Sequence, residues 1–214
     1  MVVCLLMDGY LGQMMEPVEL PPFAPVRMKA PSWAVGAEHP DGERAVLTSI
    51  NISPLVQEVF NVKMMSRWEE IEKTEVRYKG YYLDDAEYLV VGYGTAGRIA
   101  LTSVRAAREK GIKIGLLRPI TVSPFPIKVL EDLVPEMKGI LVVEMNNGQM
   151  LDDVSAIVAR RTPLHFYGRM GGVVPYPDEF TAAIEEMING EYVVNRDARR
   201  AWLAKMRDLV GTGA

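Results

Sequence analysis

Four short apolar runs, separated by longer amphipathic stretches, dominate the second half of this 214-residue chain. Runs of this length that are rich in Val, Ile and Leu are typical of strands buried on both faces of a sheet. Their alternation with segments of helical period predicts an α/β fold with a mainly parallel, doubly wound sheet. The predicted strands lie near residues 88–91, 112–117, 140–144 and 164–167, and the predicted helices near 96–110, 126–136, 149–160 and 177–189.

The residues before this sheet follow a different pattern. The run "VVCLLM" predicts a buried strand at 1–7, and "DGYLGQMMEP" predicts a turn and a short helix after it. A proline-rich stretch from 17 to 54 predicts an extended arm without a core of its own. A helical apolar pattern then predicts a connecting helix over 55–78. We therefore divide the chain at residues 16 and 85, with the sheet domain at 86–214.

Composition and charge exclude several classes of protein. Hydrophobic residues make up 49% of the chain, charged residues 24%, and the formal net charge is −4, as in ordinary soluble globular proteins. The 24 Lys and Arg residues form no basic stripe, so no nucleic-acid partner is expected. The N-terminal apolar run is too short for a membrane span and lacks the basic flank of a signal peptide, which predicts a cytoplasmic protein.

The cysteine and histidine residues indicate no metal site. Cys4 is the single cysteine, so the chain forms no internal disulfide and holds no iron–sulfur cluster. Its apolar neighbours predict a buried side chain. His39 and His165 lie far apart in the sequence, without the spacing of metal ligands. We predict no metal ligand and no catalytic residue in this chain.

The stretch "VVGYGTAGR" contains a G-x-G-x-x-G motif, with Gly92, Gly94 and Gly97 between a predicted strand and a predicted helix. A dinucleotide-binding fold would add an acidic residue about 20 positions later, to bind the ribose. Here Arg118 follows the second strand, and an arginine could hold a 2′-phosphate. A free-standing NADP-binding module therefore remains an alternative. The same glycines would also serve a tight strand-to-helix turn that binds nothing.

Two further segments follow the carboxyl ends of predicted strands, where open α/β sheets place their ligand and partner contacts. The first, "VVEMNNGQM", offers a possible protein-binding edge, which makes an adaptor domain the third alternative. The second is "FYGRMGG". In both, turn and helix-cap chemistry is the competing explanation. The candidate contact residues are Glu144, Asn146, Asn147, Gly148, Gln149 and Arg169.

The order of these motifs, with "KMMSRWEEIEK" and "LLRPITVSPFP", resembles the α subunit of 2-oxoacid:ferredoxin oxidoreductases of the 2-oxoisovalerate and 2-oxoglutarate types. The resemblance covers nearly the whole chain, and its most specific pieces are "PFP" and "E-x-N-x-G-Q". It implies that 86–214 is similar to the C-terminal domain of transketolases, with an antiparallel edge strand and a role in assembly. It also implies oxidative decarboxylation of a 2-oxoacid by thiamine diphosphate, with acyl transfer to coenzyme A and electrons passed to ferredoxin.

The same resemblance implies that this chain holds only part of the subunit. The pyrimidine-binding domain, with the glutamate that activates thiamine diphosphate, would precede residue 1, and residues 1–16 would be its remnant. The pyrophosphate and Mg²⁺ site would belong to a β subunit, and the iron–sulfur clusters to a ferredoxin-type subunit. The chain alone is then inactive and binds no cofactor. We expect it to self-associate, because the strand at 1–7 and the apolar face of the 55–71 helix would lie uncovered.

Overall fold

A computed structural model describes residues 3–23, 34, 50–190 and 197–211. The chain divides into two compact units. The first unit comprises Met1–Met14 together with Ile71–Ala214, and the second comprises Met15–Glu70. The predicted division at residues 16 and 85 remains a prediction.

The first unit contains a five-stranded sheet with the order β1-β3-β2-β4-β5. The neighbouring strands β3, β2, β4 and β5 run parallel to one another. The edge strand β1 pairs antiparallel with β3. The predicted fold class, a mainly parallel sheet, is therefore confirmed. The strands are β1 (Tyr78–Tyr81), β2 (Tyr88–Gly92), β3 (Ile114–Pro119), β4 (Gly139–Glu144) and β5 (Leu164–Gly168).

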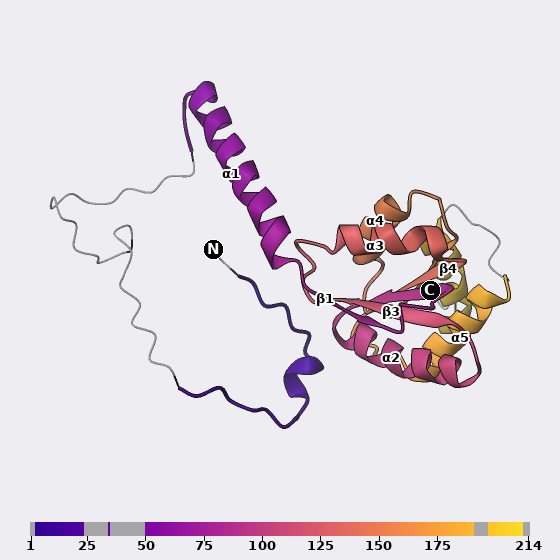
Figure 1. Cartoon of the computed structure of the whole chain (residues 1–214). Helices are drawn as coiled ribbons and strands as arrows, with labels where there is room; N and C mark the ends of the chain where they lie inside the picture. The colour runs from indigo at the N-terminus through magenta and orange to yellow at the C-terminus, as the bar shows by residue number, and fades with distance from the viewer. Residues whose placement is uncertain (1–2, 24–33, 35–49, 191–196, 212–214) are drawn as a thin grey trace. The chain divides into compact units, whose positions relative to one another are not determined.

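Helices cover both faces of this sheet (Figure 1). One face packs against α2 (Gly94–Glu109) and α5 (Pro177–Ile188). The opposite face packs against α3 (Ile127–Leu133), α4 (Gln149–Val158) and α6 (Ala198–Val210). Successive strand residues divide between the two cores, as a pleated strand requires. Short 3₁₀ turns lie at η1 (Leu11–Gln13) and η2 (Val134–Glu136).

The order of the strands creates a topological switch point between β2 and β4. These strands are neighbours, but β2 leads into α2 on one face and β4 leads into α4 on the other. Open α/β sheets bind their ligands at the carboxyl ends of strands where the connections diverge in this way. The turn after Gly92 and the loop after Glu144 lie at this point, which we call the switch-point crevice.

The N-terminal segment differs from the prediction. Residues 3–7 form no strand and are exposed, so the predicted buried strand at 1–7 is wrong for the described part of that range. Cys4 is exposed as well, not buried as predicted. A strand is stable only where a neighbour accepts and donates its backbone hydrogen bonds, and none of the described strands pairs with this segment. The predicted short helix is the 3₁₀ turn η1.

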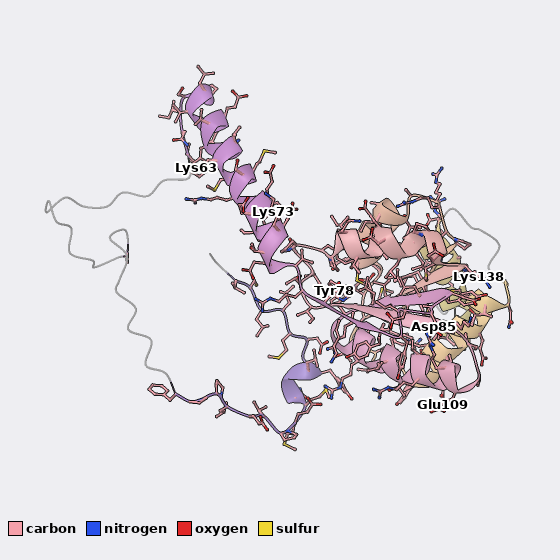
Figure 2. All side chains as sticks on the ribbon, in the orientation of Figure 1. Lys63, Lys73, Tyr78, Asp85, Glu109 and Lys138 are labelled. Atoms are coloured by element: carbon pink, nitrogen blue, oxygen red, sulfur yellow. The ribbon has the colours of Figure 1, made fainter. Side chains whose placement is uncertain are left out.

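The connecting helix is present as α1 (Pro54–Glu75), close to the predicted 55–78. None of its residues is buried, and large apolar side chains such as Leu55 and Val59 are 75% and 70% exposed. Figure 2 shows its side chains projecting from the ribbon, with Lys63 and Lys73 labelled. No helix in the described ranges is both long and apolar enough to cross a membrane.

Candidate functional site: the switch-point crevice

The three glycines at the end of β2 and the start of α2 are each explained by the backbone, through close packing or a positive φ. A Cβ atom on Gly97 would lie 2.4 Å from the carbonyl oxygen of Gly92, and one on Gly92 would lie 2.6 Å from Cγ2 of Val143. Gly94 has φ +54°, a conformation that side chains disfavour. The motif therefore allows α2 to begin directly against the sheet, and this need exists without any ligand.

Arg118 lies beside this turn. It belongs to β3, the parallel neighbour of β2, and its Cγ is 3.4 Å from the position that a Cβ on Gly97 would occupy. The structure thus brings together the four residues of the predicted dinucleotide site.

A carboxylate stands at the same turn. Thr95, the second residue of α2, is buried, and its hydroxyl donates a 3.0 Å hydrogen bond to Oδ2 of Asp8. A pyrophosphate at the start of α2 would meet this negative charge as well as the positive charge of Arg118. Within the described ranges, no three or more His, Cys, Asp or Glu residues come together as a possible metal site.

Glu144 organises the opposite side of the crevice. Its carboxylate is fully buried at the end of β4 and accepts hydrogen bonds from the backbone N–H groups of Met150, at 3.0 Å, and Leu151, at 2.9 Å. Burial raises the pKa of Glu144, and these two N–H groups oppose that shift. Glu144 therefore fixes the first turn of α4 to the end of its own strand.

The loop between Glu144 and α4 is a compact turn built by Asn146. The side-chain oxygen of Asn146 accepts hydrogen bonds from the backbone N–H groups of Gly148, at 2.7 Å, and Gln149, at 3.0 Å. Gly148 has φ +99°, which glycine adopts readily. The "NNGQ" residues thus serve the local turn, which the sequence offered as the competing explanation.

One side-chain contact connects the two sides of the crevice. The amide nitrogen of Asn146 donates a 3.1 Å hydrogen bond to the hydroxyl of Tyr93. Burial raises the pKa of the Tyr93 hydroxyl, and the charge of Glu144 adds to the effect. Of the predicted contact residues, Glu144 and Asn146 therefore meet the glycine turn through Tyr93.

Arg199, on α6, holds the same loop from outside. Its guanidinium donates to the carbonyl oxygens of Asn147, at 2.8 Å, and Gly148, at 2.6 Å, and pairs with Asp152 at 2.7 Å. This ties the C-terminal helix to the "NNGQ" loop. The carbonyl groups of Asn147 and Gly148 are thus used within the chain.

The backbone N–H of Arg169 donates a 3.2 Å hydrogen bond to the carbonyl oxygen of Glu144, but its side chain belongs to a different cluster. Its Nε lies 3.2 Å from Oε2 of Glu179 on α5, and the same carboxylate accepts a 2.5 Å hydrogen bond from the hydroxyl of Tyr167. Burial raises the pKa of Tyr167, and the adjacent Glu179 adds to the shift. These residues and Lys205 line a cavity of about 290 Å³ between β5, α5 and α6.

Sequence reasoning missed four residues of the crevice: Asp8, Tyr93, Thr95 and Arg199. Tyr93 and Thr95 occupy variable positions of the glycine motif, and the motif specifies no residue type there. Asp8 and Arg199 come from distant segments, and a pattern of local spacing carries no signal for such contacts.

Comparison with known proteins finds similar chains in one group of enzymes. Residues 86–180 match the model of pyruvate:ferredoxin oxidoreductase core domain II. The chain is 38% identical over 170 residues to the ketoisovalerate oxidoreductase subunit VorB of Methanothermobacter thermautotrophicus, an alignment that covers 79% of this chain and 48% of the relative. The chain is therefore homologous to subunits of 2-oxoacid:ferredoxin oxidoreductases.

A second relative is the 2-oxoglutarate synthase subunit KorA of Methanothermobacter marburgensis, 32% identical over 50% of this chain and 28% of the relative. Among solved structures, a 2-oxoglutarate:ferredoxin oxidoreductase from Magnetococcus marinus has the same fold, with a TM-score of 0.55, 18% identity, and coverage of 64% of this chain and 24% of that one. The chain spans about half the length of the VorB relatives it matches.

Proposed function

We propose that this chain is part of the α subunit of a thiamine-diphosphate-dependent 2-oxoacid:ferredoxin oxidoreductase. The reaction is oxidative decarboxylation, in which a 2-oxoacid, coenzyme A and oxidised ferredoxin give acyl-CoA, CO₂ and reduced ferredoxin. The observation that carries the proposal is the 38% identity to VorB over 79% of this chain. That alignment is too long to depend on the glycine motif alone.

Within this enzyme the chain has an architectural role. In the switch-point crevice, Glu144, Asn146 and Asp8 make hydrogen bonds within the chain and position its loops. Thiamine diphosphate, Mg²⁺, coenzyme A and the iron–sulfur clusters are held by other parts of the complex. We assign the partners as a thiamine-diphosphate-binding β subunit and a ferredoxin-type iron–sulfur subunit.

Depletion of the chain from a native extract tests this proposal. An immobilised antibody against the chain removes it from an anaerobic extract of the source cells, and the supernatant is assayed for viologen reduction that depends on coenzyme A and a 2-oxoacid. The acids assayed are 2-oxoisovalerate, 2-oxoglutarate, pyruvate and phenylglyoxylate. We expect activity with one of these acids to be lost, and antibody without affinity for the chain to leave it unchanged. Undiminished activity with all four acids would refute the proposal.

We also propose that the chain self-associates when it is isolated from its complex. The exposed apolar side chains of α1, including Leu55 and Val59, favour this, because water disfavours such a surface. Sedimentation velocity at rising concentration tests it. A growing share of dimer or larger species is expected, and a strictly monomeric profile would refute this part of the proposal.

A further inference from the structure

The contact between Asp8 and Thr95 joins segments that are 87 residues apart in the chain. We propose that it docks the N-terminal segment on the turn between β2 and α2, so that the chain's own carboxylate occupies this side of the switch-point crevice. The docked segment comprises Asp8 and the 3₁₀ turn η1 (Leu11–Gln13). The docking surface is the buried hydroxyl of Thr95.

Both oxygens of the Asp8 carboxylate are used, which fixes its orientation. Oδ2 accepts the hydroxyl of Thr95 at 3.0 Å, and Oδ1 accepts the backbone N–H of Leu11 at 2.7 Å. The carboxylate therefore connects the start of η1 to the start of α2. Leu11 is half-buried, whereas the other described residues from Val3 to Phe23 are exposed, as expected if the segment touches the domain at this point.

The environment of Thr95 suits a carboxylate partner. Thr95 is only 2% exposed, so water has little access to its hydroxyl. Tyr93, which precedes α2, gives no side-chain cap to the helix. The first N–H groups of a helix attract negative charge, and Asp8 supplies that charge.

The proposal concerns a contact within this chain, so its test needs no partner subunit and no enzymatic activity. Cys4 is the single cysteine and is exposed, so a nitroxide can be attached there alone. Cys4 precedes Asp8 by four residues, and such a stretch spans at most about 14 Å. In the docked state the nitroxide should therefore broaden the amide signals of Gly94, Thr95 and Ala96 in a nitrogen–proton spectrum of the full chain.

Three substitutions of threonine separate docking from general stability. Thr95→Val removes the hydroxyl at nearly constant size and should lower the ratio of docked to undocked segment about tenfold, because a hydrogen bond to a charged group is lost. Thr95→Ser keeps the hydroxyl and should keep the broadening. Thr162→Val is the matched control, since Thr162 is also buried and donates a 3.0 Å hydrogen bond to the carbonyl of Val134. It should leave the broadening unchanged.

Two outcomes would overturn the proposal. One is full broadening in Thr95→Val, and the other is an equal loss of broadening in Thr162→Val. If Thr95→Val does not fold, Asp8→Ala gives the same test without altering the sheet domain. Persistent broadening in Asp8→Ala would then refute docking through this carboxylate.

Discussion

The hydroxyl of Tyr93 accepts a 3.1 Å hydrogen bond from the side-chain amide of Asn146. Tyr93 follows β2 and Asn146 follows β4, so this bond joins the two strands at the point where their connections diverge. The two loops of the switch-point crevice therefore form one hydrogen-bonded unit.

Removing the Tyr93 hydroxyl should weaken this unit without disturbing the turns themselves. We expect Tyr93→Phe to cost about 1 kcal/mol of unfolding free energy, since one partly buried hydrogen bond is lost. Asn146→Ala should cost more, because Asn146 also holds Gly148 and Gln149. Urea unfolding of both single variants and the double variant measures the coupling, which we expect to be about 1 kcal/mol. Tyr10→Phe, at an exposed tyrosine, is the control; strict additivity would contradict the account.

The glycines of the motif should differ in how much stability an alanine substitution costs. Gly97→Ala should destabilise most, by about 2–3 kcal/mol, because its Cβ would collide with the Gly92 backbone. Gly94→Ala should cost about 1–2 kcal/mol, from its positive φ alone. Gly12→Ala, with nothing within 4 Å of the added Cβ, should be nearly neutral. Thermal unfolding gives this ranking, and a Gly97→Ala variant as stable as Gly12→Ala would show that close packing does not explain the motif.

How far the sequence predicts the fold depends on the strength of local patterns. The apolar runs predicted β2 to β5 closely, because strands buried on both faces must be apolar almost throughout. The edge strand β1 reads "YKGY", which is short and exposed, and its place was not predicted. The helix α6 was not predicted either. Residues 3–7 show the opposite error, since an apolar run predicted a strand for which the described chain provides no partner.

The contacts of Glu144 and Asn146 join residues that are close in the sequence. Glu144 ends β4, Asn146 and Gln149 follow it, and the topology places the end of that strand beside Gly92. The hydrogen bond between Asp8 and Thr95 joins residues that are 87 positions apart in the sequence. The hydrogen bond from Arg199 to the carbonyl of Asn147 joins residues that are 52 positions apart. No spacing rule connects such residues, so these contacts required the structure.

Glu144 should make stability depend on pH. Because burial raises its pKa above the ordinary 4.5, the folded chain retains a proton that the unfolded chain has already released. Its contribution to stability should therefore fall as pH rises through this window and stay constant above the raised pKa. Glu144→Gln cannot titrate and accepts only one of the two N–H groups, so it should be less stable by about 1–3 kcal/mol.

Urea unfolding of the wild type and Glu144→Gln, from pH near 4.5 to neutrality, measures this difference. The stability advantage of the wild type should narrow as pH rises. Asp132→Asn, at an exposed carboxylate that pairs with Lys128, is the control. A constant difference between the wild type and Glu144→Gln across the whole range would contradict the raised pKa.

His165 should make stability depend on pH in the direction opposite to Glu144. Burial lowers the pKa of His165 from 6.5 to about 4. Between pH 6.5 and about 4, His165 is therefore protonated in the unfolded chain but not in the folded chain. The contribution of His165 to the free energy of unfolding is therefore fully present above pH 6.5 and decreases as the pH falls toward 4. The imidazole signals of the native chain, assigned with His165→Gln, should not titrate until the pH approaches 4. Titration of His165 near its ordinary pKa would show that the folded protein leaves it accessible to water.

The composition of the particle that contains this chain in its source cell shows directly whether the chain is a subunit of a 2-oxoacid oxidoreductase. An affinity tag on the chain allows native, anaerobic purification, and mass spectrometry then identifies the proteins recovered and their ratios. We predict a thiamine-diphosphate-binding subunit and an iron–sulfur subunit in fixed ratio to the chain. Recovery of the chain alone, or only with proteins unrelated to 2-oxoacid oxidoreductases, would contradict the account.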